Sequence, residues 1–439
     1  MSENMTDHAH WLCNAHAHLS RRTLLGAGAS GLMMSSIASR LARADETSPR
    51  DRPKNLILVW LEGGPSQLET FDPHAGTKIG GEVKAIATSV KGLQIADTLP
   101  QTAEWMHTGS LIRSVTSKEG DHARAIYNVK TGFRPDPTLD HPAVGAVLLD
   151  AFPEQADLPR YISIAGTNYP GRGGYLGAKY DAFKIFDPAG QVPDIVRRVD
   201  DERYNRRIKD LLGEVETEFA RGRLRDLERN RTLHETATNA ALKMMSSAQL
   251  SAFDVNEEPR AVRAEFGNTV FGRGCLAATR LLGAGVRCVE VTLTGWDSHV
   301  NNHGIQSSQC EKLDSGLASL LKRLDERDML SNTLVVCAGE FGRTPKINVT
   351  SGRDHHPHGF SVFMAGCGIR KGFVYGETSA NPKLAKENPL QDVDNPVAIE
   401  EIHATIMKCL GIDHTEELDT PVGRPLRRIK AEPIAELIG

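Results

Sequence analysis

The stretch Asn55-Leu-Ile-Leu-Val-Trp-Leu61 decides the fold of this chain. It is a continuous apolar run that stops at Glu62-Gly63-Gly64-Pro65. A short apolar run without polar alternation, closed by glycine and proline, is typical of a strand that is buried on both faces of a parallel sheet. We therefore expect residues 55–61 to form such a strand.

Similar apolar runs recur along the chain, with helical patterns between them. The other strand-like runs cover residues 109–115, 161–165, 286–293, 332–338 and 360–365, and the helical patterns include 139–151, 271–282, 310–328 and 398–410. Strands that alternate with helices predict an α/β fold with a mostly parallel sheet sandwiched by helices. We expect a single domain over residues 55–439. Residues 195–250, dense in Arg, Asp and Glu, predict a helical insertion with a solvated charged face, or alternatively an interaction surface.

The N-terminus carries the features of an export signal. Ser20-Arg21-Arg22-Thr23 precedes a short apolar stretch over residues 24–37, and Ala42-Arg43-Ala44 follows as a cleavage pattern. Paired arginines before such a stretch indicate the twin-arginine route. We therefore expect residues 1–44 to be a twin-arginine signal peptide, which the Tat translocase would recognise, and residues 45–54 to be a linker. The expected location is periplasmic or secreted. The apolar stretch is too short to span a membrane. No other segment of the sequence has the roughly 18 consecutive apolar residues that a membrane span needs.

The charge balance limits the classes of partner. The chain has 52 Lys and Arg against 56 Asp and Glu, with a formal net charge of −4. A nucleic acid needs a concentrated basic surface, so we do not expect one as the main partner. A small anionic substrate remains compatible, because one local pocket can be positive on a nearly neutral protein.

The loops that follow the expected strands carry the functional candidates, because ligands of parallel sheets bind beyond the carboxyl ends of the strands. After the run 109–115, a loop containing His122 and Arg124 leads into a helix, whose free N–H groups and dipole favour an anion. After the first run, Glu62 begins a glycine-rich loop that lets the backbone approach a ligand. On its own that loop is foremost a turn.

Histidines and carboxylates gather in the later loops. The loops are Gly295-Trp296-Asp297-Ser298-His299, Gly339-Glu340-Phe341-Gly342-Arg343 and Gly352-Arg353-Asp354-His355-His356-Pro357-His358. Imidazole and carboxylate groups in such density are ligands for a divalent metal. The alternative is a set of polar loops whose histidines are satisfied by hydrogen bonds.

These motifs, together with the paired arginines and Gly411-Ile412-Asp413, resemble domain-of-unknown-function family 1501, which is common in planctomycete-like bacteria. The resemblance covers essentially all of the mature chain. That family is itself similar to the alkaline phosphatase and sulfatase superfamily, so the resemblance implies an alkaline phosphatase-like fold and one or two divalent metals at the strand ends.

The resemblance also implies roles for individual residues. The implied metal ligands are Glu62 from the first strand, Asp297 and His299 for the first metal, Glu340 for the second, and His356 with its neighbour His355 late in the chain. The nucleophile position falls on His122, ten residues before Gly132 of a Thr-Gly dipeptide. Arg343, Arg124 or Arg353 is available to clamp an anion.

Two departures from the superfamily pattern matter. His122 replaces a Ser, Thr or Cys, so it is a nucleophile, a base, a metal ligand or only an anion contact. Phe341 stands where a histidine ligand of the second metal is expected, which leaves one metal position better supported than two.

The sequence thus favours an exported metal-dependent hydrolase of phosphate or sulfate esters, acting on a small anionic ester or a surface glycan. Zinc or manganese suits the mixed ligands best, with calcium and magnesium as alternatives. A second hypothesis is a non-catalytic anion- or metal-binding exported protein with a degenerate site. A third is a structural protein whose histidines are only packed.

Overall fold

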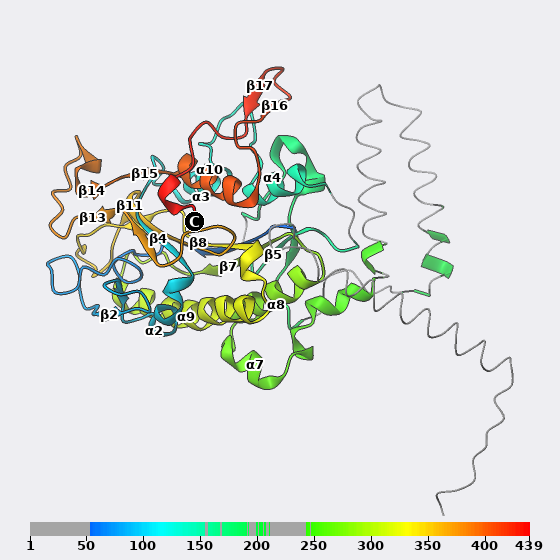
Figure 1. Cartoon of the computed structure of the whole chain (residues 1–439), viewed down its shortest axis with the longest axis horizontal. Coiled ribbons are helices and arrows are strands. Elements are labelled where there is room, and N and C mark those ends of the chain that lie inside the picture. Colours follow the sequence, from blue (N-terminus) through cyan, green and yellow to red (C-terminus); the bar gives the residue numbers. More distant parts are fainter. Residues whose placement is uncertain are drawn as a thin grey trace, which may run out of the picture. The chain divides into compact units, whose positions relative to one another are not determined.

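A computed structural model describes residues 53–153, 157–166, 169–190 and 247–439, with a few further residues between 192 and 245. The expected signal over residues 1–44, most of the linker and most of the insertion over 195–250 lie outside the described residues. Residues 53–439 form one compact unit. Figure 1 shows its arrangement, with a central sheet between two layers of helices.

The main sheet confirms the α/β class expected from the sequence. In the described part of the chain it contains nine strands, eight of them in the order β12-β4-β11-β8-β1-β7-β5-β6, with β15 paired to β4. These strands are β1 (Asn55–Glu62), β4 (Gly109–Thr116), β5 (Tyr161–Ile164), β6 (Phe183–Ile185), β7 (Cys288–Thr294), β8 (Thr333–Ala338), β11 (His358–Ala365), β12 (Phe373–Tyr375) and β15 (Val397–Ala398). The smaller strands are β2 (Ala85–Ala87), β3 (Gln94–Ala96), β9 (Gly342–Arg343), β10 (His355–His356), β13 (Glu377–Thr378), β14 (Val393–Asp394), β16 (Glu417–Asp419) and β17 (Pro425–Arg427).

Strand β1 lies inside the sheet and is buried on both faces, as its apolar run predicts. It pairs in parallel with β7 on one side and with β8 on the other. Ile57, Val59 and Leu61 belong to one hydrophobic core, while Leu56, Leu58 and Trp60 belong to the core on the opposite face. Because successive side chains of a strand point to opposite faces, a run without polar residues serves both cores at once.

Strand β11 is the exception in a sheet of parallel pairs. It runs antiparallel to both of its neighbours, β4 and β8. The start of β11 therefore lies at the edge where the parallel strands end. This reversal brings the histidines that precede β11 to the same edge as the loops that follow β1, β4, β7 and β8.

Helices cover both faces of the sheet (Figure 1). The helices are α2 (Pro100–Trp105), α3 (His122–Thr131), α4 (Val144–Ala151), α7 (Arg260–Glu265), α8 (Val270–Gly283), α9 (Asn302–Glu326) and α10 (Ile399–Leu410). Residues of α2, α8 and α9 pack into the core with Ile57, and those of α3, α4 and α10 pack into the core with Leu56. Helix α4 begins later than the predicted pattern over 139–151, because Pro142 disfavours a helical conformation of the residue before it.

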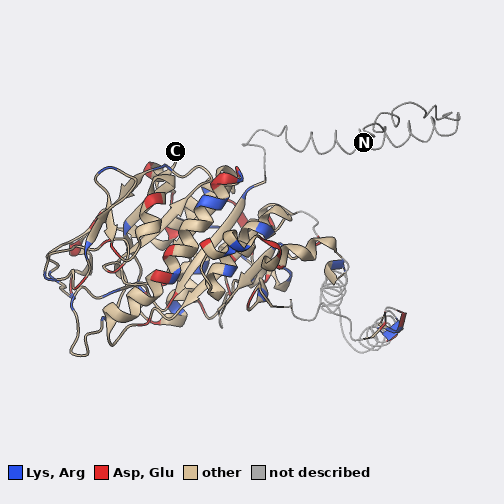
Figure 2. Ribbon diagram, turned by 90° about the horizontal axis from the view of Figure 1, so that it is seen from below, with Lys and Arg blue, Asp and Glu red and all other residues tan. Residues whose placement is uncertain are grey.

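None of the described helices is long and apolar enough to cross a membrane. Figure 2 shows Lys and Arg interspersed with Asp and Glu along the described elements, in keeping with a formal net charge of −4. The electrostatics of any site on this unit therefore depend on its immediate neighbours rather than on a field of one sign.

Candidate metal centre

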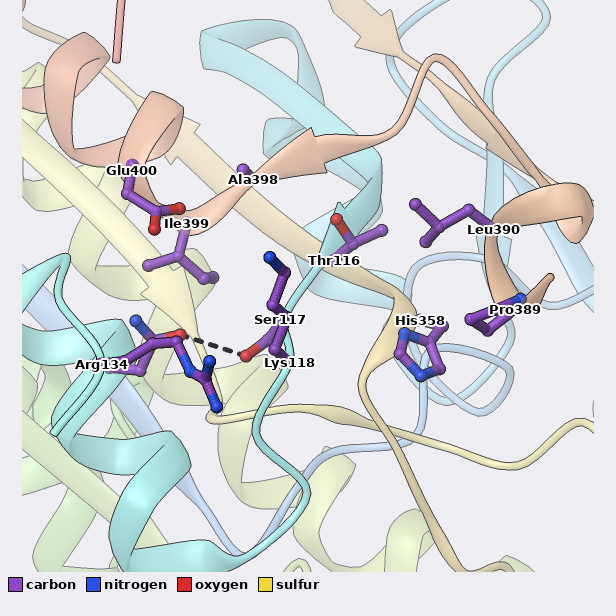
Figure 3. A pocket seen from close by; sticks show the side chains of 11 residues that line it. Thr116, Ser117, Lys118, Arg134, His358, Pro389, Leu390, Ala398, Ile399 and Glu400 are labelled. Atoms are coloured by element: carbon purple, nitrogen blue, oxygen red, sulfur yellow. Dashed lines mark hydrogen bonds between the residues drawn. The ribbon is translucent and has the colours of Figure 1, made fainter. Parts of the chain in front are cut away.

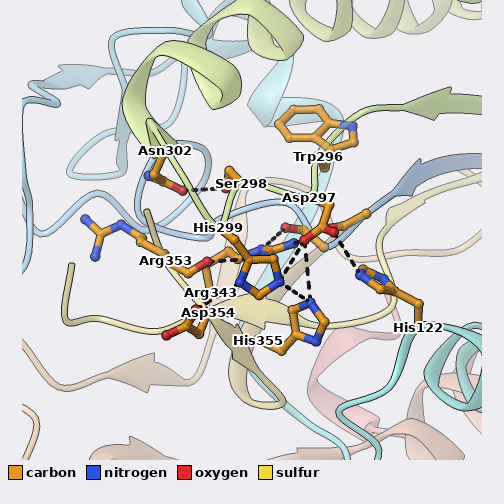
Figure 4. A network of polar contacts seen from close by, with 12 residues as sticks. His122, Trp296, Asp297, Ser298, His299, Asn302, Arg343, Arg353, Asp354 and His355 are labelled. Carbon is orange, nitrogen blue, oxygen red and sulfur yellow. Dashed lines mark hydrogen bonds and ion pairs between the residues drawn. The ribbon is translucent and has the colours of Figure 1, made fainter. Parts of the chain in front are cut away.

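The residues after three parallel strands converge with the start of β11 at one edge of the sheet. His122 begins α3 after β4, Asp297 and His299 follow β7, and Glu340 follows β8, while His355 lies in β10 just before β11. Figure 4 shows the side chains of His122, Asp297, His299 and His355 directed toward one another. The structure thus brings together most of the site residues that the sequence predicts.

Asp297 lies at the centre of this group, with its side chain 46% exposed. Its Oδ1 is 3.2 Å from Nε2 of His299 and 3.5 Å from Nε2 of His355, and its Oδ2 is 3.5 Å from Nε2 of His122. The Nε2 atoms of His299 and His355 are 3.0 Å apart. Three imidazole nitrogens therefore surround one carboxylate.

The other ring nitrogen of each histidine, Nδ1, is held by an oxygen acceptor. The three pairs are His299 with Asp354 Oδ1 at 2.9 Å, His355 with the carbonyl oxygen of Gly120 at 2.8 Å, and His122 with Glu340 Oε1 at 2.7 Å. A carbonyl or an ionised carboxylate can only accept, so each Nδ1 donates its proton. Each Nε2 of a neutral ring then presents a lone pair toward Asp297.

This arrangement fits a divalent metal ion. Lone pairs and a carboxylate that face one another repel unless a cation lies between them. A tetrahedral ion with bonds of about 2.0–2.1 Å holds its ligand atoms about 3.3–3.4 Å apart. The separations of 3.0, 3.2 and 3.5 Å among His299, His355 and Asp297 bracket that value. Metal-bound histidines also characteristically donate their second ring N–H to a carboxylate or carbonyl, as these three do.

His122 belongs to the same group by distance. One ligand atom each of His122, Asp297 and His355 lies within 4.8 Å of the other two. His122 Nε2 is buried without a hydrogen-bond partner among the described residues. The hydrogen bond to Glu340 raises the pKa of His122, and burial opposes this rise only in part.

Glu340 anchors His122 from a fully buried position. Its Oε1 accepts a second hydrogen bond, at 2.9 Å, from the backbone N–H of Gly63, while Oε2 has no partner in the described structure. Gly63 has a φ of 118°, and a Cβ there would lie 2.6 Å from the backbone nitrogen of Asp297. The glycine after β1 thus permits the close approach of the loops that carry Asp297 and Glu340.

The guanidinium of Arg343 binds the Asp297 carboxylate and is not directed into the open space beside it. Its guanidinium is fully buried, and Nη2 donates to Asp297 Oδ1 at 2.7 Å. The remaining bonds go to backbone oxygens of Gly63, Gly64 and Arg353. Burial alone would raise the pKa of Asp297, but the hydrogen bond and charge of Arg343 hold it below its usual range. Asp297 therefore stays ionised and oriented.

Phe341 forms the apolar wall of the centre. Its ring is fully buried, with its centroid 5.0 Å from that of His122 and 4.4 Å from that of His355. The position at which the resemblance implies a ligand of a second metal therefore packs against the histidines of the first. Burial lowers the pKa of His355, which favours the neutral, metal-binding form of its ring.

Two predicted residues, His356 and Arg124, lie apart from this group. His356 is the second residue of β10, and its ring lies beside His358, with centroids 5.8 Å apart. Arg124 is 49% exposed and pairs with Glu119 at 2.7 Å. Glu62 ends β1 at the same edge of the sheet. Neighbouring side chains of a strand alternate between its faces, so only one of His355 and His356 could face Asp297.

Two groups that the centre uses were not among the predicted site residues, Asp354 and the carbonyl oxygen of Gly120. Asp354 had a detectable signal, since a carboxylate beside a histidine pair is a common anchor for imidazole. Gly120 had none, because any residue supplies a carbonyl oxygen.

Two pockets flank α3. One, of about 290 Å³, lies beside Ser117, Lys118 and Arg134 and opposite His358, Pro389 and Leu390 (Figure 3). The other, of about 310 Å³, lies against Ala123, Tyr127 and Lys130 and the loop from Tyr169 to Arg172. Both volumes are at the lower end of the range for small-molecule sites, roughly 300–1,000 Å³.

Among solved structures, the chain is similar to a phosphonate monoester hydrolase from Silicibacter pomeroyi (10% identity, TM-score 0.39, covering 83% of this chain and 74% of that chain). It is also similar to the zinc complex of the C-terminal periplasmic domain of EptC from Escherichia coli (10% identity, TM-score 0.37, covering 86% of this chain and 89% of that chain). A third similar structure is a sulfatase from a Pseudoalteromonas species (10% identity, TM-score 0.39, covering 82% of this chain and 68% of that chain).

No curated protein matches the sequence. The model of a family described as "Protein of unknown function (DUF1501)" matches residues 53–438, nearly the whole of the described unit. The chain therefore belongs to the DUF1501 family.

Proposed function

We propose that this chain is an exported, metal-dependent hydrolase of phosphate or sulfate esters. One observation carries the proposal: the Nε2 atoms of three histidines surround the Asp297 carboxylate, while each Nδ1 donates to an oxygen. Such a set of ligand atoms suits a divalent cation at this edge of the sheet, and a bound cation would attract an anionic ligand.

Asp297, His299 and His355 are the residues that would hold the ion. Two imidazoles and one carboxylate suit zinc or manganese better than calcium or magnesium, which prefer oxygen ligands. A bound divalent ion supplies Lewis-acid polarisation of the ester oxygen and neutralises its charge. Arg343 keeps the Asp297 carboxylate in place for this task, and its own bonds leave it poorly placed to clamp a substrate.

His122 would act on the ester itself. Its Nδ1 is fixed by the buried Glu340, and its Nε2 faces the space beside Asp297 Oδ2. A base oriented by a carboxylate in this way is the usual arrangement for proton transfer or for nucleophilic attack by nitrogen. His122 would therefore take the proton of the attacking water. Alternatively, Nε2 would attack the phosphorus or sulfur atom and displace the ester alcohol, and water would then release phosphate or sulfate from the ring.

A second candidate function is metal or anion binding without turnover. The first residue of α3 is a histidine where the superfamily that this family resembles carries a hydroxyl or thiol nucleophile. The guanidinium groups of Arg124 and Arg343 are also engaged, one with Glu119 and the other with the loops of the centre. These features favour a binding site whose catalytic groups have been lost.

Export belongs to the same proposal. The paired arginines at positions 21 and 22, the apolar stretch over 24–37 and Ala42-Arg43-Ala44 support a twin-arginine signal that ends near residue 44. Replacing both arginines with lysine should retain the protein in the cytoplasm of its host. Unchanged delivery to the periplasm or medium would contradict this route.

The decisive experiment measures metal content and turnover on the same preparation. Protein purified without chelator is analysed for bound divalent metals, and the metal-loaded form is assayed with 4-nitrophenyl phosphate and 4-nitrophenyl sulfate. We expect one divalent ion per chain and hydrolysis of one ester. Bound metal without turnover of either ester supports the binding function. Absence of bound metal after zinc or manganese loading excludes the hydrolase and leaves only anion binding.

A further inference from the structure

The pocket on the Ala123 side of α3 begins next to the candidate metal centre. Ala123 lines it and directly follows His122 in the helix. Lys130 lines its other end, and seven residues of α-helix span about 10 Å. The pocket therefore extends along α3 from the neighbour of His122 for about 10 Å, which is the length of one or two six-membered rings.

The floor of this pocket carries no net charge. Lys130 Nζ is 2.7 Å from Glu290 Oε1 and donates to the carbonyl oxygen of Tyr169 at 2.6 Å, and both charged side chains are buried. Its ammonium also lies over the Trp60 ring, 4.9 Å from the centroid. The one buried cation of the lining is thus fully engaged, and it does not create a phosphate or sulfate site.

The remaining polar groups are balanced between donors and acceptors. Tyr127, Thr131 and His141 supply uncharged hydroxyl and imidazole groups, and Asp140 and Arg172 add one charge of each sign at the rim. Burial raises the pKa of Tyr127 to about 12, so its hydroxyl stays protonated. Burial also lowers the pKa of His141, whose ring is neutral near pH 7. Tyr127 Oη accepts from the backbone N–H of His141 at 2.6 Å, and Thr131 Oγ1 donates to the carbonyl oxygen of Tyr127 at 2.8 Å. A ligand here meets the remaining hydrogen-bonding capacity of these groups and little net charge.

Aromatic surface completes the lining. Tyr127 lies on the helix side, and Tyr169, 41% exposed, lies on the opposing loop. Tyrosine offers an apolar ring with a polar end, which suits a ligand with both C–H faces and hydroxyl groups.

Two backbone hydrogen bonds tie the Gly171-Arg172 part of the opposing loop to its neighbours. The Gly171 carbonyl accepts from Ala182 N–H at 3.0 Å, and the Arg172 carbonyl accepts from Ala143 N–H at 2.8 Å. Such pre-formed walls lower the entropic cost of binding.

We infer that this pocket binds a neutral sugar ring, so that the ester handled at the metal centre is one carried on a glycan. The inference deepens the proposed function and rests on it for the link to catalysis, whereas sugar binding itself does not require turnover. A sugar supplies hydroxyl groups that donate and accept, together with apolar ring faces, and it carries no charge that the pocket would have to neutralise. A bare phosphate or sulfate ion finds no unpaired buried cation in the same lining.

The test measures sugar binding to the metal-loaded protein by isothermal titration calorimetry. The probes are methyl glycosides and disaccharides of glucose, galactose, mannose, xylose and N-acetylglucosamine. We expect at least one to bind, and Tyr169→Ala to weaken that binding about tenfold. Phe186→Ala, which removes an aromatic side chain that is 75% exposed and outside the pocket, should leave the affinity unchanged. If no probe binds, or if the two variants bind equally well, the inference is wrong.

A second measurement separates this inference from the proposed function. The KM for a sugar phosphate or sulfate of the bound sugar should rise in Tyr169→Ala and stay unchanged in Phe186→Ala. Hydrolysis of the aryl esters without sugar binding would overturn only the sugar site. Sugar binding without hydrolysis of any ester would overturn only the hydrolase.

Discussion

His299 and His355 face each other with their Nε2 atoms 3.0 Å apart, and Nδ1 of each ring donates its proton to another acceptor. Two bare nitrogens at this distance repel unless a metal ion or a proton lies between them. Asp297 Oδ1 lies 3.2 Å from Nε2 of His299 and 3.5 Å from Nε2 of His355. The negative charge of this carboxylate makes a cation between the three atoms still more favourable. The pair is therefore the most direct point at which to test the metal centre.

His355→Ala should abolish stoichiometric metal binding, while His356→Ala should preserve it. Loss of one of three ligands is expected to weaken affinity for zinc or manganese by about 100-fold or more, since even indirect partners contribute 10- to 100-fold. Metal content after dialysis and a chelator competition measure the effect. The two variants are a matched pair, because both remove a histidine of β10 and only His355 faces Asp297. Metal loss in His356→Ala with retention in His355→Ala would reverse the assignment.

His122→Ala should keep the metal and lose turnover. A positioned acid, base or nucleophile commonly contributes about 10²- to 10⁴-fold to the rate, and the decrease should fall in this range. Glu340→Gln keeps an oxygen acceptor for His122 Nδ1 but removes the charge, so we expect a smaller loss of kcat with metal retained. Steady-state assays and metal analysis on both variants provide the check. A His122→Ala protein that no longer binds metal would instead make His122 a ligand.

Arg343→Lys should weaken metal binding although Arg343 is not a ligand. Lysine cannot donate to Asp297 and to the carbonyls of Gly63 and Gly64 at the same time, so the carboxylate loses its fixed orientation. We expect about 10- to 100-fold lower metal affinity.

Arg353→Lys is the control for Arg343→Lys. Arg353 is equally buried, but it pairs with Glu69 at 3.2 Å and not with Asp297. Both variants should lower the melting temperature, and only Arg343→Lys should change the metal affinity. Equal affinities in the two variants would show that Arg343 supports the fold alone.

The parts of the fold that were predictable are those with two-sided burial. The run Asn55–Leu61 matches β1 because both faces of the strand contact a core, which leaves no polar residue in the pattern. Helix α9 was predicted from residue 310 but begins at Asn302, because its first turns carry polar residues such as His303 and lack apolar periodicity. Apolar periodicity in the sequence reflects burial in the core. The ends of helices and strands near the polar site are therefore the hardest to predict.

The choice between His355 and His356 shows the limit of sequence reasoning at the site. Adjacent residues of a strand point to opposite faces, so a register error of one residue exchanges a ligand for a packed side chain. The sequence contains both histidines and no local feature that separates them. The antiparallel course of β11, which brings either histidine to the edge, depends on pairing with β4 and β8 that a single sequence does not reveal.

A last prediction concerns acid stability away from the metal centre. His403 of α10 is buried, its Nε2 donates to the carbonyl oxygen of Val129 in α3 at 2.8 Å, and burial lowers its pKa to about 4. Because this pKa lies below the unfolded value of about 6.5, the folded state holds the neutral ring. The resulting stability is fully present above about pH 6.5 and is lost as pH falls toward 4, by about 3 kcal/mol in total.

The comparison of wild type with His403→Gln isolates this contribution, because glutamine keeps an N–H donor for Val129 and does not titrate. Urea unfolding at pH 7, 5.5 and 4.5 should show a steeper loss of unfolding free energy in wild type, with a gap between the proteins that shrinks or reverses on acidification. Other histidines with a lowered pKa, such as His356 with a pKa of about 4, contribute equally to both proteins and cancel in the difference. A gap that stays constant across this range would mean that His403 titrates alike in the folded and unfolded chains, and that its hydrogen bond between α3 and α10 does not depend on a neutral ring.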